Sequence, residues 1–456
     1  MTRNRTIRQL VFSLIVLLST LKWFFLASIA GVLVGLASAF FLLTLDAGIN
    51  RVSQWNYYFL LIPVAFFLSV FLVMKFAPEA KGHGTEKVIE AIHKKSGDMN
   101  AKVIPVKLLA TLITLISGGS AGKEGPCAQI GAGVASVFAK VTRMNAIDRK
   151  RFVLCGISAG FSAVFGTPIA GAIFAGEVIF VGRFSYREFL PSLIASYFSF
   201  FITRYFGVKH LIYEIDFLIG SELSLTFHML ILGIFIGIVA IVFITVLNII
   251  EEGIAGVPIS PYLKGIIGGL VLIGVVTASG SLDYIGLGTH VIDDALAGNS
   301  ISPGSSFIKM FTTSVTLGSG GSGGILTPIF YIGSTAGNLW GQIVGKDLAL
   351  FSAVGMTAFL AATTNTPLAA ILLGIELFGV KAGSFGAIAC AVSYLIVGHM
   401  SVYPSQVLSE NKTFFSDSET NLEMGKVDRS DYVIHDPFLR KIIDRIKYYV
   451  DSRKNK

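Results

Sequence analysis

The chain has 456 residues, of which 53% are hydrophobic and only 14% are charged, whereas a soluble domain has about 25% charged residues. This composition excludes an ordinary soluble domain and predicts a protein that crosses a membrane several times. The formal net charge of +8 does not indicate nucleic-acid binding, because most basic residues flank apolar segments, as topology signals do in membrane proteins.

The two ends of the chain are basic. Residues 1–22 start with arginines and continue into an apolar run, but no small-residue cleavage site precedes Trp23, so we expect a cytoplasmic N-terminal helix rather than a signal peptide. The polar tail, 411–456, contains a predicted amphipathic basic helix at 437–453. Because basic residues favour the cytoplasm, both termini are predicted to be cytoplasmic, with the protein in the cell inner (plasma) membrane.

Between these ends lie apolar runs of two lengths. Long uncharged runs that can cross about 30 Å of hydrocarbon include 24–45, 59–74 and 229–250. Shorter runs with internal Gly, Ser, Thr or Pro occupy 103–117, 126–139 and 325–345. Helices that stop partway through a membrane have this character, and they must line a cavity or lie buried in protein. The short runs therefore indicate a transport path.

The two halves of the chain are similar to each other. Residues 114–126 read TLISGGSAGKEGP, and residues 316–328, 202 positions later, read TLGSGGSGGILTP. A second match, 199 positions apart, pairs TPIAGAIFAGE at 167–177 with TPLAAILLGIE at 366–376. Matches in the same order predict two membrane repeats with the substrate site at their interface.

We assign the first membrane repeat to 23–223 and the second to 224–410. In each, a Ser-Gly-Gly-Ser segment precedes an apolar stretch and predicts a helix N-terminus, whose unpaired N–H groups attract anions. One terminus contributes only about 0.3–1 kcal/mol, so several must converge on an anion. Binding by backbone dipoles remains weak enough for release, which favours conduction.

Glu124 lies in this region, in the segment GKEGP at 122–126. A carboxylate at mid-bilayer costs about 2.5–3.5 kcal/mol, and the N–H groups that bind an anion would offset this cost. Glu124 would then compete with the anion, and its protonation or displacement would open the path. A helix-capping glutamate near the interface is the alternative.

The sequence resembles the chloride channel and transporter (CLC) family over about residues 20–410. The segments that carry the resemblance are GKEGP at 122–126, similar to the family's GREGP; GILTP at 324–328, similar to GxFxP; FGTPIAGAIFAGE at 165–177; and Tyr403 in SVYPSQVL. The resemblance implies an all-α polytopic, inverted-repeat fold with many tilted and discontinuous helices, assembled as a homodimer with one pore per subunit.

The resemblance also implies roles for single residues. Glu124 would be the external gating glutamate, the amides of Ile325 and Leu326 would contact the central anion, and the Tyr403 hydroxyl would close its inner side. Read without the resemblance, Tyr403 is an interfacial aromatic residue. The other anion-binding residues that we expect are His83, Gly84, Gly122, Lys123 and Gly125.

Three positions depart from the family pattern. GHGTE at 82–86 stands where the family has GSGIP, so His83 replaces a serine that faces the anion. A histidine there could donate N–H to the anion and attract it when protonated; a solvated loop histidine is the alternative. Val178 occupies the inner proton-relay position and cannot relay a proton, while Lys123 replaces an arginine and keeps its charge. The neighbouring Glu177, like its repeat partner Glu376, is expected to be structural at a helix end.

These features predict a passive, glutamate-gated channel for chloride or another small anion, in contact with membrane lipid. The alternative is a proton-coupled antiporter of chloride or fluoride. An enzyme is not expected, because the seven histidines are scattered, and the segment GSGGSG at 318–323 lacks the strand that a dinucleotide site needs. Three cysteines in apolar sequence support neither disulfides nor a metal site. We expect no cofactor and no metal.

Overall fold

The computed structural model describes residues 2–210, 213, 215, 217, 221–412, 416–417, 419–427, 433–434, 437, 440, 441 and 445. Most of the tail helix expected at 437–453 lies outside these residues.

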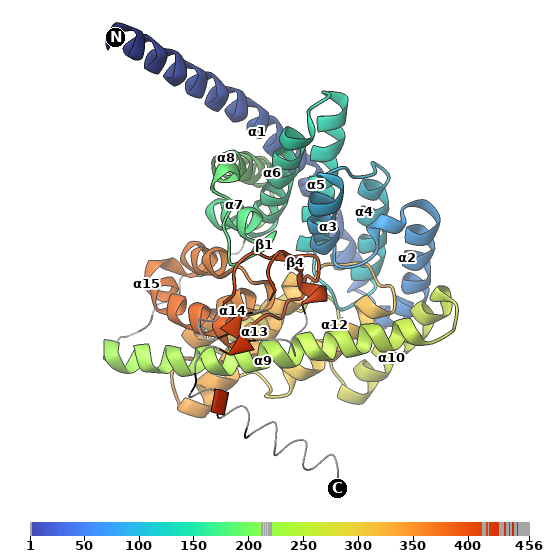
Figure 1. Ribbon diagram of the computed structural model, residues 1–456. Helices are drawn as coiled ribbons and strands as arrows, with labels where there is room; N and C mark the ends of the chain where they lie inside the picture. Colours follow the sequence, from blue (N-terminus) through green and yellow to red (C-terminus); the bar gives the residue numbers. More distant parts are fainter. Residues whose placement is uncertain are drawn as a thin grey trace.

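Helices form almost all of the described structure, which confirms the predicted all-α polytopic fold (Figure 1). The helices of the first half are α1 Thr2–Val52, α2 Ile62–Phe76, α3 Thr85–Lys95, α4 Val103–Ile116, α5 Glu124–Val141, α6 Ala146–Phe165, α7 Pro168–Glu177 and α8 Tyr186–Tyr205. Those of the second half are α9 Glu222–Gly256, α10 Pro261–Ser279, α11 Thr289–Leu296, α12 Ser305–Gly318, α13 Leu326–Val344, α14 Leu348–Thr364 and α15 Pro367–Ile396. Short 3₁₀ turns occur at Tyr58–Leu61, Pro78–Ala80 and Met424–Lys426.

The helices follow the same order in both halves. A long helix comes first (α1, α9), a second span follows (α2, α10), and a short helix (α3, α11) precedes the pair that flanks each Ser-Gly-Gly-Ser segment (α4–α5, α12–α13). Helix α15 corresponds to α7 and α8 together, since Gly379 interrupts it with φ of 85°. The order of elements therefore agrees with the repeat found in the sequence.

Five helical segments in the described part of the chain are long and apolar enough to cross a membrane. They are Gln9–Val52, Tyr58–Phe76, Glu222–Gly256, Pro261–Ser279 and Pro367–Ile396. The first three contain the long runs predicted at 24–45, 59–74 and 229–250. Helix α1 runs without a break through residue 22, so the prediction of a separate N-terminal helix that ends there is wrong. The first turns of α1 extend away from the body of the protein (Figure 1).

Glycines let neighbouring helices approach closely at equivalent places in the two halves. A Cβ on Gly131 of α5 would lie 2.5 Å from the carbonyl oxygen of Gly156 on α6. In the second half, a Cβ on Gly333 of α13 would lie 2.7 Å from the carbonyl oxygen of Gly355 on α14. Small residues of this kind allow tight helix packing in membranes, where no hydrophobic driving force brings helices together.

Short strands join the tail to the helical body. Strand β1, Phe180–Val181, pairs in parallel with β2, Val407–Leu408, which pairs antiparallel with β4, Leu422–Glu423. A separate pair consists of β3 Ser416–Asp417 and β5 Val433–Ile434.

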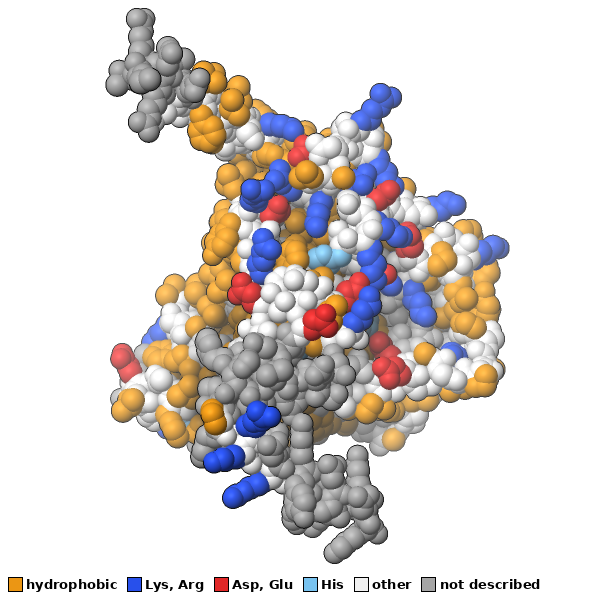
Figure 2. Space-filling model, in the orientation of Figure 1, with side chains coloured by type: hydrophobic (Ala, Val, Ile, Leu, Met, Phe, Trp, Pro, Cys, Tyr) orange, Lys and Arg blue, Asp and Glu red, His pale blue; other side chains and the backbone are white. Residues whose placement is uncertain are grey.

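The basic loops at 75–102 and 140–151 lie side by side. Lys140 Nζ, at the end of α5, donates to the carbonyl oxygen of Met99 at 2.8 Å, and Arg149 Nε donates to that of Ser96 at 3.1 Å. Figure 2 shows Lys and Arg side chains gathered on this face, with hydrophobic side chains along much of the rim. The two loops therefore belong to one side of the protein, as their charge predicts.

Candidate functional site

The two Ser-Gly-Gly-Ser loops, 117–120 and 319–322, have the same backbone shape. Gly118 has φ of 100° and Gly320 has φ of 102°, a region that only glycine occupies without strain. Each loop ends one helix and leads toward the N-terminus of the next, α5 or α13. The sequence pattern thus produces two equivalent helix N-termini.

Reciprocal hydrogen bonds join these loops across the repeats. Ser120 N donates to Thr316 Oγ1 at 3.1 Å, and the equivalent Ser322 N donates to Thr114 Oγ1 at 3.0 Å. In such an exchange, residue i of one copy contacts residue j of the other and the reverse holds too, which is the signature of a two-fold relation. The two halves therefore meet about a local two-fold axis at this point.

Gly122 and Gly324 lie at the centre of this arrangement. Gly122 N donates to Gly324 O at 2.7 Å, and Gly324 N donates to Gly122 O at 2.6 Å. Gly122 also leaves room for the Glu124 side chain, because a Cβ there would lie 2.5 Å from Glu124 Oε2 and 2.9 Å from Thr327 N. The glycine is thus required by the packing of the carboxylate beside it.

Glu124 is the first residue of α5, and its side chain crosses to the other repeat. Its Oε2 accepts from Thr327 N at 3.1 Å and its Oε1 accepts from Thr327 Oγ1 at 2.5 Å, while the residue is only 2% exposed. Because Thr327 is the second residue of α13, the carboxylate lies at the N-terminus of α13, where the helix dipole stabilises negative charge. Glu124 is therefore a buried carboxylate held at a helix end of the other repeat.

Ile325 and Leu326 stand beside Thr327 at the same helix end. They are the N-cap and the first residue of α13, so their backbone N–H groups have no acceptor inside their own helix. The Glu124 carboxylate therefore lies at the helix end where the sequence predicts an anion, bound to the N–H of the next residue, Thr327.

The N-termini of α3 and α5 are in direct backbone contact at two glycines. Gly84 is the N-cap of α3 with φ of 80°, and a Cβ on it would lie 2.4 Å from Gly125 O. A Cβ on Gly125 would lie 2.2 Å from His83 O. Gly84 and Gly125 are therefore needed for close approach, and they bring the predicted His83 loop against the Glu124 loop.

His83 is buried, which excludes a histidine turned to solvent. Its Nε2 lies 2.9 Å from Glu251 Oε1 near the end of α9. Its Nδ1 has no hydrogen-bond partner in the described part of the chain. Sequence reasoning did not identify Glu251, because nothing in the pattern around α9 connects it with a loop 168 residues earlier. Lys123, the N-cap of α5, is partly exposed, and its positive charge acts on Glu124.

Tyr403 is fully buried, as expected for a residue at the site rather than at a membrane interface. Its hydroxyl lies close to that of Thr85 and within electrostatic range of Glu86 and Glu124. Neither hydroxyl has a hydrogen-bond partner within the described residues. Thr85, the first residue of α3, was not predicted, although it lies in the departing segment GHGTE.

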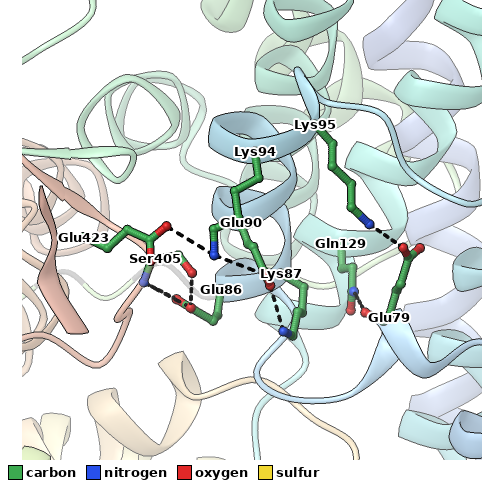
Figure 3. A network of polar contacts seen from close by, with 9 residues as sticks. All are labelled: Glu79, Glu86, Lys87, Glu90, Lys94, Lys95, Gln129, Ser405 and Glu423. Carbon is green, nitrogen blue, oxygen red and sulfur yellow. Dashed lines mark hydrogen bonds and ion pairs between the residues drawn. The ribbon is translucent and has the colours of Figure 1, made fainter. Parts of the chain in front are cut away.

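A polar network fixes the Tyr403 segment against α3 (Figure 3). The Glu86 carboxylate accepts from Ser405 N at 3.1 Å and from Ser405 Oγ at 2.5 Å. Further along α3, Lys94 Nζ lies 3.1 Å from Glu423 Oε1 in β4. Glu86, which replaces the proline of the family pattern, therefore holds Tyr403 beside Thr85.

Val178 is buried, and its carbonyl oxygen accepts from Gln406 Nε2 at 2.8 Å. The side chain offers no polar atom, and the loss of a proton relay at this position stays a prediction. Gln406 also donates to Thr364 O at 2.8 Å, so this region is tied to the segment that follows Tyr403.

Glu177 and Glu376 each cap the N-terminus of a helix in the opposite repeat. Glu177 accepts from the backbone N–H groups of Leu368 and Ala369 at 3.1 and 2.9 Å, at the start of α15. Glu376 accepts from the N–H groups of Ile169 and Ala170 at 3.1 and 2.7 Å, at the start of α7. The expectation of carboxylates bound at helix ends is confirmed, and the exchange is again reciprocal.

Two buried lysines occupy equivalent positions in the two repeats. The sequence patterns discussed above did not predict that either lysine is buried. Lys107 Nζ donates to Gly82 O at 2.7 Å and Ala80 O at 3.3 Å. Lys309 Nζ donates to Gly286 O at 2.9 Å. Their separation of 202 residues equals the repeat offset, a signal that could have identified both. Lys107 secures the loop before His83.

The fold and the site define a membrane protein with a carboxylate placed on paired helix N-termini, the arrangement of an anion transporter or channel. The sequence profile of the voltage gated chloride channel family matches residues 65–398, and the chain belongs to this family. A chloride/fluoride channel protein of Pseudomonas syringae pv. tomato is 34% identical over 405 residues, which cover 86% of this chain and 87% of that protein.

Other relatives are named as exchangers. The H(+)/Cl(-) exchange transporter ClcA of Yersinia pestis bv. Antiqua (strain Angola) is 30% identical over 412 residues, covering 82% of this chain and 83% of the relative. The crystal structure of a CLC-type fluoride/proton antiporter superposes with a TM-score of 0.81 at 28% identity, covering 85% of this chain and 98% of that one. These relatives are transporters or channels, and the chain shares their anion-transport family.

Proposed function

We propose that this protein is a proton-coupled antiporter of a small halide, with fluoride ahead of chloride. The observation that carries the proposal is the hydrogen bonding of the buried Glu124 carboxylate to the N-terminus of α13. The ionised side chain and an anion compete for the same N–H groups. Protonation removes the charge of Glu124 and frees the helix end, so that anion entry favours proton uptake.

The relatives support this proposal over the passive channel expected from the sequence. Two of those described above are named as exchangers or antiporters of protons with chloride or fluoride. The absence of a relay side chain at Val178 had favoured a channel, but it removes only one route for the proton. The alternative stated from the sequence, proton-coupled antiport, is therefore preferred.

The order of anions rests on the donors around the site. The hydroxyls of Thr85 and Tyr403 are buried without partners among the described residues, and Thr327 already donates its hydroxyl to a carboxylate. A small, strongly hydrated anion needs such donors to replace its water, because stripping an ion without compensation is costly. Fluoride fits this requirement better than chloride does.

The proposed function also includes roles for the other expected site residues and a dimeric assembly. The amides of Ile325 and Leu326 and the Tyr403 hydroxyl would contact the central anion, with Gly84, Gly122 and Gly125 allowing the close backbone approach. Lys123 would attract anions toward Glu124. The protein would be a homodimer in lipid in the plasma membrane, with the basic loops and both termini on the cytoplasmic side.

Purified protein in liposomes tests the proposal. With the fluoride gradient fixed, a pH gradient should shift the reversal potential, and a proton gradient should drive fluoride uphill. Glu124→Gln should abolish proton movement, because the glutamine side chain cannot exchange a proton. A reversal potential that follows the anion gradient alone and ignores pH would show a passive channel. Parallel measurements with chloride test the order of the two halides.

A further inference from the structure

The pair formed by His83 and Glu251 connects the interior of the site with the surface. His83 Nε2 and Glu251 Oε1 are 2.9 Å apart, and the side chain of His83 is 8% exposed whereas that of Glu251 is 32% exposed. Glu251 lies near the end of α9, in the second half, and His83 directly precedes the N-cap of α3, in the first half. A buried imidazole is thus linked to a partly exposed carboxylate.

His83, the buried member of this pair, lies in a loop that contacts the segment containing Glu124. His83 O and Gly125 are in direct backbone contact, and Gly125 follows Glu124 in the chain. His83 Nδ1 is buried and has no partner within the described structure. Several buried side-chain atoms of the described residues have no hydrogen-bond partner. Of these atoms, His83 Nδ1 is the one that belongs to an imidazole, carboxylate or ammonium group.

The buried carboxylates Glu177 and Glu86 and the buried ammonium group of Lys107 are occupied by structural contacts. Both oxygens of Glu177 accept from the N-terminus of α15, and Glu86 is held by Ser405. Lys107 donates to two carbonyl oxygens. Val178 has no titratable atom. His83 therefore has what these groups lack, a free titratable nitrogen and a partly exposed partner.

We infer that His83 and Glu251 form the inner proton path of this transporter. The inference rests on the proposed antiport. In inward transfer, the proton that leaves Glu124 is taken up by Nδ1 of neutral His83, and Glu124 becomes a carboxylate. The resulting imidazolium releases the proton on Nε2 to the Glu251 carboxylate, which passes it to the solvent. One proton enters His83 and one leaves, so His83 returns to its neutral form as the other tautomer.

The charges around His83 suit a transient imidazolium. Burial disfavours the charged imidazolium most strongly, but the Glu251 carboxylate, by its charge and its hydrogen bond, and the charge of Glu86 outweigh both burial and the opposing Lys107. The pKa of His83 is therefore held above its ordinary value, which stabilises the proton while it is in transit. The geometry also explains why this antiporter can do without a titratable side chain at position 178.

The test measures fluoride and proton fluxes in the same proteoliposomes, with a fluoride electrode and a pH electrode. Both His83→Gln and Glu251→Gln should lower proton flux by at least about tenfold, a modest loss for removing a group that transfers a proton. In Glu251→Gln, a change outside the expected anion-binding residues, fluoride flux should change by less than about twofold, because backbone N–H groups are proposed to hold the anion. Glu251→Asp, which retains a carboxylate, should keep a measurable part of the proton flux.

Matched controls separate this role from a structural one. His93→Gln alters a histidine in the last turn of α3, whose Nε2 lies 2.8 Å from Ile179 O. Glu252→Gln alters the exposed neighbour of Glu251. Both should retain the wild-type ratio of protons to fluoride. If His83→Gln does not elute as a folded species, Glu251→Gln decides by itself, since its side chain is partly exposed.

Two negative results have different meanings. If the wild-type protein moves fluoride without protons, the proposed antiport is wrong and no inner proton path exists. If the wild type couples the two fluxes and both His83→Gln and Glu251→Gln keep the wild-type ratio, antiport stands and the His83–Glu251 pair is not the proton path.

Discussion

The Glu124 carboxylate, which belongs to the first half of the chain, accepts both its inter-repeat hydrogen bonds from Thr327, which belongs to the second half. The Thr327 hydroxyl is 2.5 Å from Oε1 and the Thr327 N–H is 3.1 Å from Oε2. One residue of α13 therefore holds the Glu124 side chain of α5, in part with a backbone N–H at the start of the helix. Under the proposed function, the strength of this hold sets how easily an anion displaces the carboxylate.

Thr327→Val should tighten anion binding. The substitution keeps the shape and the backbone N–H but removes a hydrogen bond to a charged group, worth about 1.5–3 kcal/mol. If the free energy that holds the Glu124 carboxylate at the helix end falls by about 1.4 kcal/mol, the apparent affinity for fluoride rises about tenfold. Isothermal titration calorimetry measures this change. Thr327→Ser retains the hydroxyl and should bind as the wild type does. Equal affinities in all three proteins would show that Thr327 does not restrain the gate.

Glu177→Gln and Glu376→Gln should both reduce stability to a similar extent. Each change replaces a carboxylate that accepts from two buried N–H groups, at an expected cost of about 1–3 kcal/mol. Both variants should melt at lower temperature in detergent, while the ratio of protons to fluoride stays at the wild-type value. A changed ratio in Glu177→Gln without a lower melting temperature would instead place Glu177 on the proton path.

Tyr403→Phe should weaken anion binding without destabilising the fold. The hydroxyl is buried and has no hydrogen-bond partner among the described residues, so its removal relieves rather than creates an unsatisfied group. Fluoride affinity should fall by about tenfold, because a hydrogen bond to an anion contributes about 1.5–3 kcal/mol. Tyr331→Phe is the matched control, since this buried hydroxyl is also unpaired but lies beside Gly288. A similar loss of affinity in both variants would contradict a specific role for Tyr403.

The docking of the tail strand β4 on α3 should weaken in acid. Burial raises the pKa of Glu423, but hydrogen bonds from Lys94 and Lys426 outweigh it and hold the pKa below the ordinary value of 4.5. A depressed carboxyl pKa stabilises the folded form above the ordinary value, and this contribution is lost as the pH falls through the lowered pKa. The effect is small, because pairs near the surface contribute about 0–1 kcal/mol.

Hydrogen exchange of residues 422–427 checks this pH dependence. Protection, corrected for the intrinsic exchange rate, should fall between about pH 6 and about pH 3.5 in the wild type. Glu423→Gln should show the lower protection at both values. A wild-type protein with constant protection over this range would show that the Lys94–Glu423 pair does not hold the strand.

The sequence determined the local features of this protein. Apolar runs such as 24–45 and 229–250 had to become membrane helices, because the bilayer thickness fixes the length of a span. The Ser-Gly-Gly-Ser pattern at 117–120 and 319–322 had to produce helix N-termini, because it combines backbone freedom with short polar side chains. Segment GKEGP then placed Glu124 at one of these ends. Each feature depends on residues close together in the chain.

Only the tertiary structure decided which of these features meet. Glu124 faces Thr327, 203 residues away, and His83 faces Glu251, 168 residues away. Glu177 could be expected at a helix end, but not at the N-terminus of α15. Local patterns specify helices, spans and turns, whereas a contact between distant residues depends on how the two halves pack. For this reason the sequence identified Glu124 as a candidate, and the fold was needed to identify the groups that hold its carboxylate and the pair that we propose to carry its proton.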